Sequence, residues 1–486
     1  MKTKSLQHNF VVYFIRTLFN GLTPLLIFPY ASRVLGVSNI GGVTYAQSIA
    51  AYFEYFAMLG INSYGVREGA KCRDNPRAFG KLMTELLIIN TASTVIASFI
   101  YTVLICSSTA LQPYRVFLLV FLLEIIFRGL NLDWYYNIIE DYDYIAKRTV
   151  IFQIIDVAVL LLFVRDENSA VAYAVVLVLP FVLTSITNIG TMCKRVKLFG
   201  YSDYHFKGHV IGTISVFSVV VSTLVYLMID TTMLGVLRGD YDVGLYTAAS
   251  KLTRECSQVI TSLCAVFLPR LAVHRAKGEV KEFQRIATNA CNIIMALAIP
   301  ATVGMFSLSK QAILIFSGQN YLEAIPAMKI LTFNFMFAAI DGFFGWQVLV
   351  PYNRERALFS ATFTGAVIDV VLNTLLIPTY GPSGAAIATL IAEMTIFAIL
   401  LFHTRQYLPI SVIFRHFWQY VLCSLPIVGI AYASTHLLPG VILPTAVSIV
   451  CSVLVYFALL YALGNPYIRQ YAQKGLAWGK KHLLHR

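Results

Sequence analysis

The sequence predicts an all-α, polytopic membrane protein with about fourteen transmembrane helices. Hydrophobic residues make up 58% of the 486 residues and charged residues only 13%, whereas soluble proteins carry about 25% charged residues. Apolar windows of the length needed to cross a bilayer core of about 30 Å recur along the whole chain. These observations exclude an ordinary soluble protein. The net charge of +13 then reflects membrane topology rather than a nucleic-acid partner.

The predicted spans are, in chain order, 9–31, 43–64, 82–106, 114–138, 148–165, 169–192, 208–230, 244–268, 286–307, 322–350, 357–377, 383–403, 416–437 and 441–463. The first span contains Pro24 and Pro29 and is expected to end at Ser32-Arg33. A glycine-rich turn at residues 36–42 then leads into the second span, which is expected to begin near Val43.

Lysine and arginine fall mostly in every second connector between the predicted spans. The exceptions are Arg33, Arg115, Arg165, Arg238 and Lys310. Because cytoplasmic connectors carry the excess of Lys and Arg, we expect both termini in the cytoplasm and an even number of spans.

Short stretches recur six predicted spans apart. Leu35-Gly36-Val37 returns as Leu234-Gly235-Val236, Ile40-Gly41 as Val243-Gly244, and the Trp134 to Asp156 spacing as Trp346 to Asp369. An even offset predicts a parallel repeat about an axis along the membrane normal. We therefore expect two six-helix lobes, residues 1–200 and 201–407, around a central cavity. Residues 408–486 would add two helices and a basic cytoplasmic tail.

After the charges counted with the connectors are subtracted, fifteen charged residues remain inside the predicted spans: Arg16, Arg128, Lys251, Arg254, Lys329, Glu54, Glu85, Glu124, Asp133, Asp156, Asp230, Glu255, Asp341, Asp369 and Glu393. A charge at the bilayer centre costs at least about 2.5–3.5 kcal/mol, so most must face protein or water. Pairs four residues apart, Glu124 with Arg128 and Lys251 with Glu255, fit structural ion pairs. A cavity lined instead by Arg16, Lys251 and Arg254 would bind a phosphorylated substrate.

Three intramembrane carboxylates, Glu54, Asp156 and Asp369, are candidates either for ion coupling or for a structural role. A desolvated carboxylate can exchange a proton or hold Na⁺. Glu54 has no partner nearby in the sequence, and Asp156 and Asp369 occupy equivalent places in the two predicted halves. The scattered cysteines show no metal-ligand spacing, so we expect no metal or organic cofactor, with H⁺ or Na⁺ as the coupling ion.

Three segments carry a family resemblance: LGINSYGVREGAK at 59–71, FPYASRVLG at 28–36 and YAQSI at 45–49. They resemble the polysaccharide-transporter family that includes the O-antigen flippase Wzx, within the multidrug/oligosaccharidyl-lipid/polysaccharide exporter superfamily. The resemblance is strongest over the first 80 residues. It implies translocation of an undecaprenyl-diphosphate-linked oligosaccharide by alternating access. It also implies that Arg16, Lys251 and Arg254 meet the diphosphate, with Arg33 at the outer mouth.

Two other functions stay open. A multidrug/cation antiporter of the same superfamily would use the intramembrane acids, and a membrane-embedded polymerase or acyltransferase would need catalytic groups. No Ser-His-Asp, HExxH or glycine-rich phosphate motif occurs, so we expect a transporter and not an enzyme. The resemblance implies a monomer in the bacterial inner membrane, working with membrane lipids and with polysaccharide polymerase and glycosyltransferases.

Overall fold

The computed structural model describes residues 6–265 and 267–469; the side chains of residues 6–20, 22, 218–220, 222, 223, 225, 259 and 261–265 lie outside that description. All regular elements of the described residues are helical. The chain divides into two compact units, Met1–Thr247 and Ala248–Arg486.

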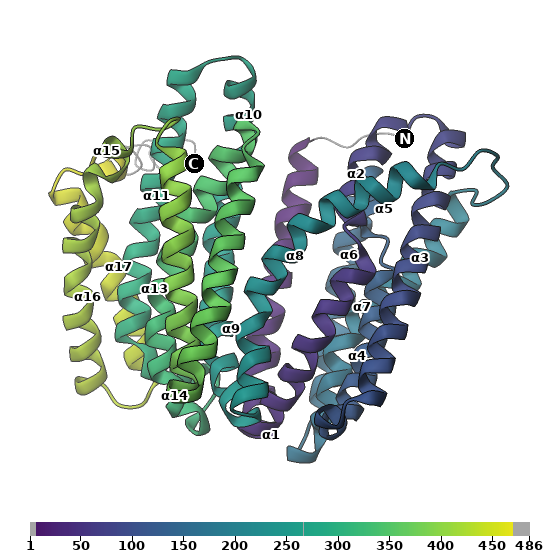
Figure 1. The fold of residues 1–486 in the computed structure, drawn as a ribbon. Coiled ribbons are helices and arrows are strands. Elements are labelled where there is room, and N and C mark those ends of the chain that lie inside the picture. Colours follow the sequence, from purple (N-terminus) through teal and green to yellow (C-terminus); the bar gives the residue numbers. More distant parts are fainter. Residues whose placement is uncertain (1–5, 266, 470–486) are drawn as a thin grey trace, which may run out of the picture. The chain divides into compact units, whose positions relative to one another are not determined.

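The first unit contains helices that run alternately up and down (Figure 1). In chain order they are α1 (Leu6–Met58), α2 (Ile61–Cys72), α3 (Pro76–Ser107), η1 (Thr109–Tyr114), α4 (Arg115–Gly129), α5 (Asp133–Ile138), α6 (Tyr142–Phe163), η2 (Glu167–Ser169), α7 (Ala170–Arg195), α8 (Phe206–Leu237) and the first two turns of α9 (Asp240–Ala265). The short helices α2 and α5 lie at one end of this unit, its upper end in Figure 1, which we call the basic end because Arg67, Lys71 and Arg73 belong to it.

The second unit holds the rest of α9 and the remaining helices. These are α10 (Leu268–Ala276), α11 (Val280–Ser307), α12 (Ser309–Phe316), η3 (Gln319–Ala324), α13 (Ile325–Gly342), the π-helix η4 (Phe343–Leu349), η5 (Val350–Tyr352), α14 (Glu355–Thr404), α15 (Ile410–Ile413), η6 (Phe414–His416), α16 (Phe417–Leu437) and α17 (Ile442–Ala462). Within it α13 packs against α14, and α11 against both α13 and α16.

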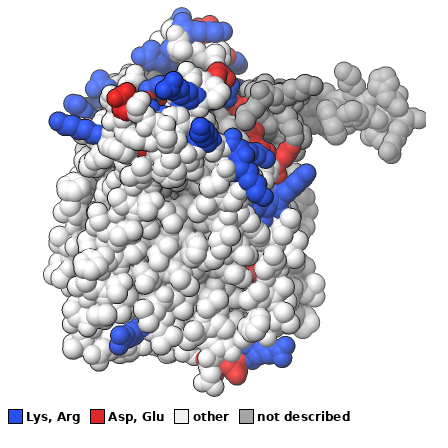
Figure 2. Space-filling view, turned by 90° about the vertical axis from the view of Figure 1, so that its right-hand side faces the viewer, with Lys and Arg blue, Asp and Glu red and all other residues white. Residues whose placement is uncertain are grey.

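Seven helical segments of the described residues are long and apolar enough to cross a membrane: Pro76–Ser107, Glu167–Arg195, Val280–Ser307, Gln319–Tyr352, Glu355–Thr404, Ile410–Leu437 and Ile442–Ala462. The face in Figure 2 agrees, because Lys and Arg gather along its upper edge and a broad uncharged belt lies below them. The prediction of an all-helical, multi-pass membrane protein is confirmed.

Two predicted turns are much tighter than expected. The helix does not end at Ser32-Arg33: α1 runs from Leu6 to Met58, and Gly36 alone leaves the helical region, at φ 77° and ψ 176°. Likewise α14 covers both predicted spans 357–377 and 383–403, with a break only at Gly381, at φ 53°. Glycine lacks a Cβ and adopts positive φ readily, so one residue is enough to redirect the chain.

Two predicted spans end earlier than expected. The second span was predicted to reach residue 64, but α1 ends at Met58 because Leu59 and Gly60 adopt left-handed φ angles of 45° and 70°. The fourth span was predicted to reach residue 138, but α4 ends at Gly129 and residues 133–138 form the separate helix α5. Glu54 therefore lies one turn from the end of its helix rather than well inside it.

The turn at Gly36 packs closely against the start of α9. A Cβ atom on Gly41 would lie 1.8 Å from the carbonyl oxygen of Asp240, and a Cβ atom on Gly244 would lie 2.2 Å from that of Val37. The Tyr114 hydroxyl donates to the Asp240 carboxylate at 2.6 Å. Burial raises the pKa of Asp240, and the hydrogen bond from Tyr114 opposes that rise. Only glycine at residues 41 and 244 allows the two segments to approach this closely.

One of the proposed sequence matches between the halves, that of Gly36 with Gly235, needs correction. Gly235 does not correspond to the turn at Gly36, because it lies inside α8 beneath the ring of Tyr45. The positive-φ glycine that ends α8 is Gly239, at φ 91°, and it stands 203 residues after Gly36, as Gly244 does after Gly41. The two tryptophans also differ: Trp134 is 1% exposed and Trp346 is 57% exposed.

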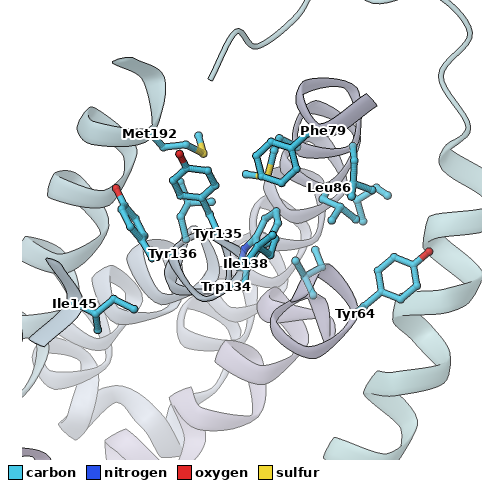
Figure 3. Packing of buried hydrophobic residues seen from close by; sticks show 14 residues of the cluster. Tyr64, Phe79, Leu86, Trp134, Tyr135, Tyr136, Ile138, Ile145 and Met192 are labelled. Carbon is cyan, nitrogen blue, oxygen red and sulfur yellow. The ribbon is translucent and has the colours of Figure 1, made fainter. Parts of the chain in front are cut away.

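A cluster of buried hydrophobic side chains, several of them aromatic, fills the basic end of the first unit (Figure 3). The members labelled there come from α2, α3, α5, α6 and α7: Tyr64, Phe79, Leu86, Trp134, Tyr135, Tyr136, Ile138, Ile145 and Met192. Gly65 of α2 lies against the Trp134 indole, and a Cβ atom there would meet ring carbon Cε3 at 2.6 Å. The close approach of α2 to α5 therefore depends on this glycine.

Replacing Gly65 with alanine should destabilise the protein by about 1–3 kcal/mol, because the added methyl overpacks the Trp134 ring. Thermal unfolding of the detergent-purified protein measures this. Gly190→Ala in α7 is the matched control, since its Cβ would meet no atom within 4 Å. It should be neutral or slightly stabilising. Equal unfolding temperatures for the two variants would contradict this account of the packing.

Candidate functional site

An ion-paired triad joins α1 to α4 in the first unit. Arg128 Nε lies 2.9 Å from Glu54 Oε1, and Arg128 Nη1 lies 3.0 Å from Glu124 Oε1. The two carboxylates are buried, and the guanidinium lies over the Phe181 ring at 4.1 Å. The predicted pair of Glu124 with Arg128 is confirmed. Glu54, for which sequence offered no nearby partner, shares the same arginine, so the triad carries one net negative charge when fully ionised.

A second network ties together the helices at the basic end. Arg148 of α6 is 6% exposed, and its Nη2 lies 3.0 Å from Asp133 Oδ1 of α5. Asn188 of α7 donates to the same carboxylate at 2.9 Å and accepts from Arg148. Buried polar groups paired in this way brace a helix bundle, so Asp133 and Arg148 have a structural role here.

A third link joins α3 to α8. The carboxylate of Glu85, 3% exposed, lies 3.1 Å from His209 Nε2 and accepts from the backbone N–H of His205 at 2.6 Å. The Tyr64 hydroxyl lies 2.9 Å from the other ring nitrogen of His209. Close by on the surface, Lys71 and then Arg67 donate to Glu68; these hydrogen bonds hold the pKa of the Glu68 carboxyl below its ordinary value.

Asp156 stands apart from these paired acids. It lies near the middle of α6, is 3% exposed, and its Oδ1 accepts no hydrogen bond from the described residues. Its carboxylate acts electrostatically on the buried hydroxyl of Tyr173 on α7. A buried carboxyl of this kind is suited to holding a proton.

The four basic candidates lie in different settings. Arg16 is part of α1, but its side chain lies outside the described residues. Arg33 is exposed and donates to the carbonyl oxygen of Pro29 one turn earlier at 2.5 Å. Lys251, half-buried, and Arg254, exposed, lie on neighbouring turns in the middle of α9. The field of Glu255 acts on Lys251 and opposes that of Arg254, so this segment of α9 carries one net positive charge.

The second unit also buries acids. Asp369 and Asn373 lie one turn apart on α14, and both are fully buried. Asp341 of α13 lies within electrostatic reach of Glu393 of α14, a proximity that the sequence analysis missed because these residues are 52 positions apart on different helices. In the part of the chain that the structure describes, no group of three or more His, Cys, Asp and Glu residues could hold a metal ion.

Replacing Arg128 with methionine should cost about 3–5 kcal/mol in stability, because Glu54 and Glu124 would then be buried without a partner. Unfolding of the purified protein in detergent measures the loss. The triple variant Glu54→Gln, Glu124→Gln, Arg128→Met removes all three charges and should recover most of it. An Arg128→Met protein as stable as the wild type would contradict the triad.

The family model for "Polysaccharide biosynthesis protein" matches residues 6–274, more than half of the chain. A putative O-antigen transporter of Escherichia coli is 20% identical over 415 residues, which cover 83% of this chain and 97% of that one. A probable low-salt glycan biosynthesis flippase, Agl15, of Haloferax volcanii is 24% identical over 193 residues. That match covers 40% of this chain and 38% of the relative, so the chain spans well under two thirds of that protein.

Two solved structures show the fold. The lipid II flippase MurJ, in an inward closed conformation, aligns with a TM-score of 0.75 at 17% identity over 94% of this chain and 98% of that one. A multidrug resistance transporter of the MATE family, in the MOP superfamily, aligns with a TM-score of 0.59 at 15% identity over 82% of this chain and 96% of that one.

These matches confirm the family resemblance carried by residues 28–36, 45–49 and 59–71. They also confirm the prediction of a membrane transporter rather than an enzyme. The chain belongs to the polysaccharide biosynthesis protein family and has the fold of the MurJ and MATE transporters.

Proposed function

We propose that this protein is a flippase that carries an oligosaccharide linked to undecaprenyl diphosphate from the inner to the outer leaflet of a bacterial inner membrane. The observation that carries the proposal is the end-to-end similarity to a putative O-antigen transporter, 83% of this chain against 97% of the relative. The partial similarity to a probable glycan flippase supports it, and so does the fold shared with a lipid II flippase.

The basic residues of α9 would bind the diphosphate. Lys251 and Arg254 stand eleven and fourteen residues after the first residue of α9, so at about 1.5 Å per residue they lie about 17 and 21 Å into the helix. Cations at such depth are costly unless they face protein, water or an anionic ligand. Arg16 would join them from the first helix and Arg33 would serve the outer mouth, as the family resemblance implies.

Alternating access between two related halves would move the substrate. The reciprocal contact supports this: Gly41 meets Asp240 while Gly244 meets Val37, and each residue of one pair stands 203 positions from its counterpart in the other. Such an exchange of equivalent partners is what a two-fold axis produces. We propose lobes of residues 1–200 and 201–407 on this basis, with residues 408–486 as an addition and fourteen spans in all.

We also propose the orientation in the membrane and the partners. Both termini would lie in the cytoplasm, because basic connectors are found on the cytoplasmic side of membranes. Membrane lipids would surround a monomer that receives its cargo from glycosyltransferases and delivers it to a polymerase. H⁺ or Na⁺ would drive the cycle, with Glu54, Asp156 and Asp369 as coupling or structural carboxylates. For Glu54, the ion pair with Arg128 favours the structural role.

A multidrug/cation antiporter remains the second candidate. The buried acids of the second unit, Asp341, Asp369 and Glu393, favour it, since an organic cation needs an acidic site. Flux of a fluorescent organic cation into proteoliposomes, with no transfer of a lipid-linked glycan, would decide for this function.

The basic pair can be tested directly in proteoliposomes that contain an undecaprenyl-diphosphate-linked oligosaccharide. An external glycosidase that cannot cross the bilayer reports how fast the sugar reaches the other leaflet. Lys251→Ala with Arg254→Ala should slow flipping by about 10–100-fold, because charged hydrogen bonds of about 1.5–3 kcal/mol are lost. Lys277→Ala, in the connector after α10, is the control and should leave the rate unchanged.

Unchanged flipping rates would contradict the assignment of these basic residues to the diphosphate. If single replacements of Arg16, Lys251 and Arg254 and the double variant all flip at the wild-type rate, these residues do not bind the diphosphate. If the wild-type protein flips no lipid-linked glycan, the proposed function itself is wrong.

A further inference from the structure

A pocket lies at the basic end of the first unit, where the connector between α7 and α8 packs against the start of α3. Its volume is about 250 Å³, and it is lined by Asn75, Arg77, Ala78, Lys81, Tyr201 and Ser202. The connector comes close at Gly80, because a Cβ atom there would lie 2.1 Å from the Tyr201 hydroxyl oxygen. That hydroxyl donates to the carbonyl oxygen of Lys197 at 2.7 Å. Two segments far apart in the sequence therefore form the walls of the pocket.

The two cations that line the pocket have no acidic partner among the described residues. The Lys81 ammonium donates to the backbone carbonyl oxygen of Asp203, and no carboxylate of the described residues pairs with the Arg77 guanidinium. Asp74, the acid nearest to Arg77 in the sequence, lies 4.0 Å from Arg73 instead. An anion in the pocket would therefore meet two positive charges that lack a counter-ion there.

The positive charge of the pocket comes from these side chains and not from the end of α3. The side-chain oxygen of Asn75 already accepts from the backbone N–H groups of Arg77 and Ala78, at 3.1 and 3.2 Å. The first N–H groups of the helix are thus satisfied within the protein, and a bound anion would contact the guanidinium and the ammonium.

The same face of α3 continues from the pocket as an exposed apolar stripe. Ile88 and Val95 stand eleven and eighteen residues after Arg77, which is close to three and five full turns of a helix. Both side chains are exposed, as is that of Phe99 one turn further on. The segment Pro76–Ser107 is long and apolar enough to cross a membrane, so this stripe faces lipid and the pocket lies at its end. Figure 2 agrees, since Lys and Arg lie directly above a broad uncharged belt.

An exposed aromatic residue of the connector lies between the cations and the stripe. The backbone N–H of Phe199 donates to Thr84 Oγ1 at 3.2 Å, and Thr84 stands two turns after Arg77 and one turn before Ile88 on α3. The Phe199 side chain is 59% exposed. Aromatic rings are enriched where a membrane meets water, and a fully soluble anion would make no use of an apolar ring here.

We infer that this pocket binds the phosphate of an anionic glycerophospholipid, such as phosphatidylglycerol, from the leaflet around the basic end. Arg77 and Lys81 would contact the phosphate and supply its counter-charge. The acyl chains would lie along the stripe of Ile88 and Val95, with the Phe199 ring beside them. Charge and apolar surface favour the same ligand, because a phospholipid offers both in this order along the membrane normal. The inference does not depend on which substrate the protein carries.

Binding of phosphatidylglycerol can be measured on the detergent-purified protein by native mass spectrometry. The wild type should bind it more tightly than phosphatidylcholine. Arg77→Gln with Lys81→Gln should weaken the binding by about 30-fold, the loss expected for two cations near an anionic lipid surface. Glutamine at residue 81 can still donate to the Asp203 carbonyl oxygen, so the connector stays in place.

The matched control removes the same charge from the same end of the protein. Arg67→Gln with Lys71→Gln changes two residues that are already paired with Glu68, and it should leave the binding of phosphatidylglycerol nearly unchanged. Equal losses in the two double variants would show a general effect of surface charge and overturn the pocket. Binding of the two lipids with equal affinity by the wild type would overturn it as well.

Two further measurements distinguish a lipid from a free phosphate. Phe199→Ser should weaken the binding of phosphatidylglycerol several-fold, because the ring contacts only the lipid, and millimolar inorganic phosphate should not displace the lipid from the wild type. Displacement by inorganic phosphate, together with unchanged lipid binding in Phe199→Ser, would identify a site for soluble anions and overturn the lipid assignment.

Discussion

The structure is governed by the lack of water in the bilayer core, where every polar group must find its partner inside the protein. The triad of Glu54, Glu124 and Arg128 is the clearest result of that constraint. Two carboxylates, each almost fully buried, meet one guanidinium at about hydrogen-bond distance. The triad fixes how α1 packs on α4. Glu85 and Asp133 have partners on other helices too, His209 and Arg148.

The same constraint separates structural from functional charges. In the first unit most buried acids have a basic partner, so these acids stabilise the packing of the helices. Among the residues that the structure describes, no basic side chain acts on Asp156. In the second unit, the buried Asp341 lies within electrostatic reach of another acid, Glu393. Charges that stay uncompensated after folding cost free energy, so we propose Asp156 as a residue that binds a proton or an ion. Lys251 and Arg254, in the middle of α9, are the cations that we propose for the substrate.

Sequence alone predicted the positions of the helices well, because long apolar runs bounded by basic connectors are typical of membrane-spanning helices. It failed at single residues. From the sequence we expected a turn of several residues at each of the breaks at Gly36 and Gly381. Nothing in the local sequence shows that one glycine with positive φ is enough to redirect the chain. Proximity across helices was also hidden: Glu54 and Arg128 are 74 residues apart, and Asp341 and Glu393 are on different helices. By contrast Glu124 and Arg128, four residues apart, were predictable.

The central claim is that the chain recognises an anionic phospho-glycan lipid rather than an organic cation. The most direct test is the unfolding temperature of the purified protein with each ligand. A ligand that binds only the folded state stabilises it by about 2.7 kcal/mol at a hundredfold excess over its Kd. The account predicts that an undecaprenyl-diphosphate-linked oligosaccharide raises the unfolding temperature and that tetraphenylphosphonium does not. Stabilisation by the cation, with none by the glycan lipid, would contradict it.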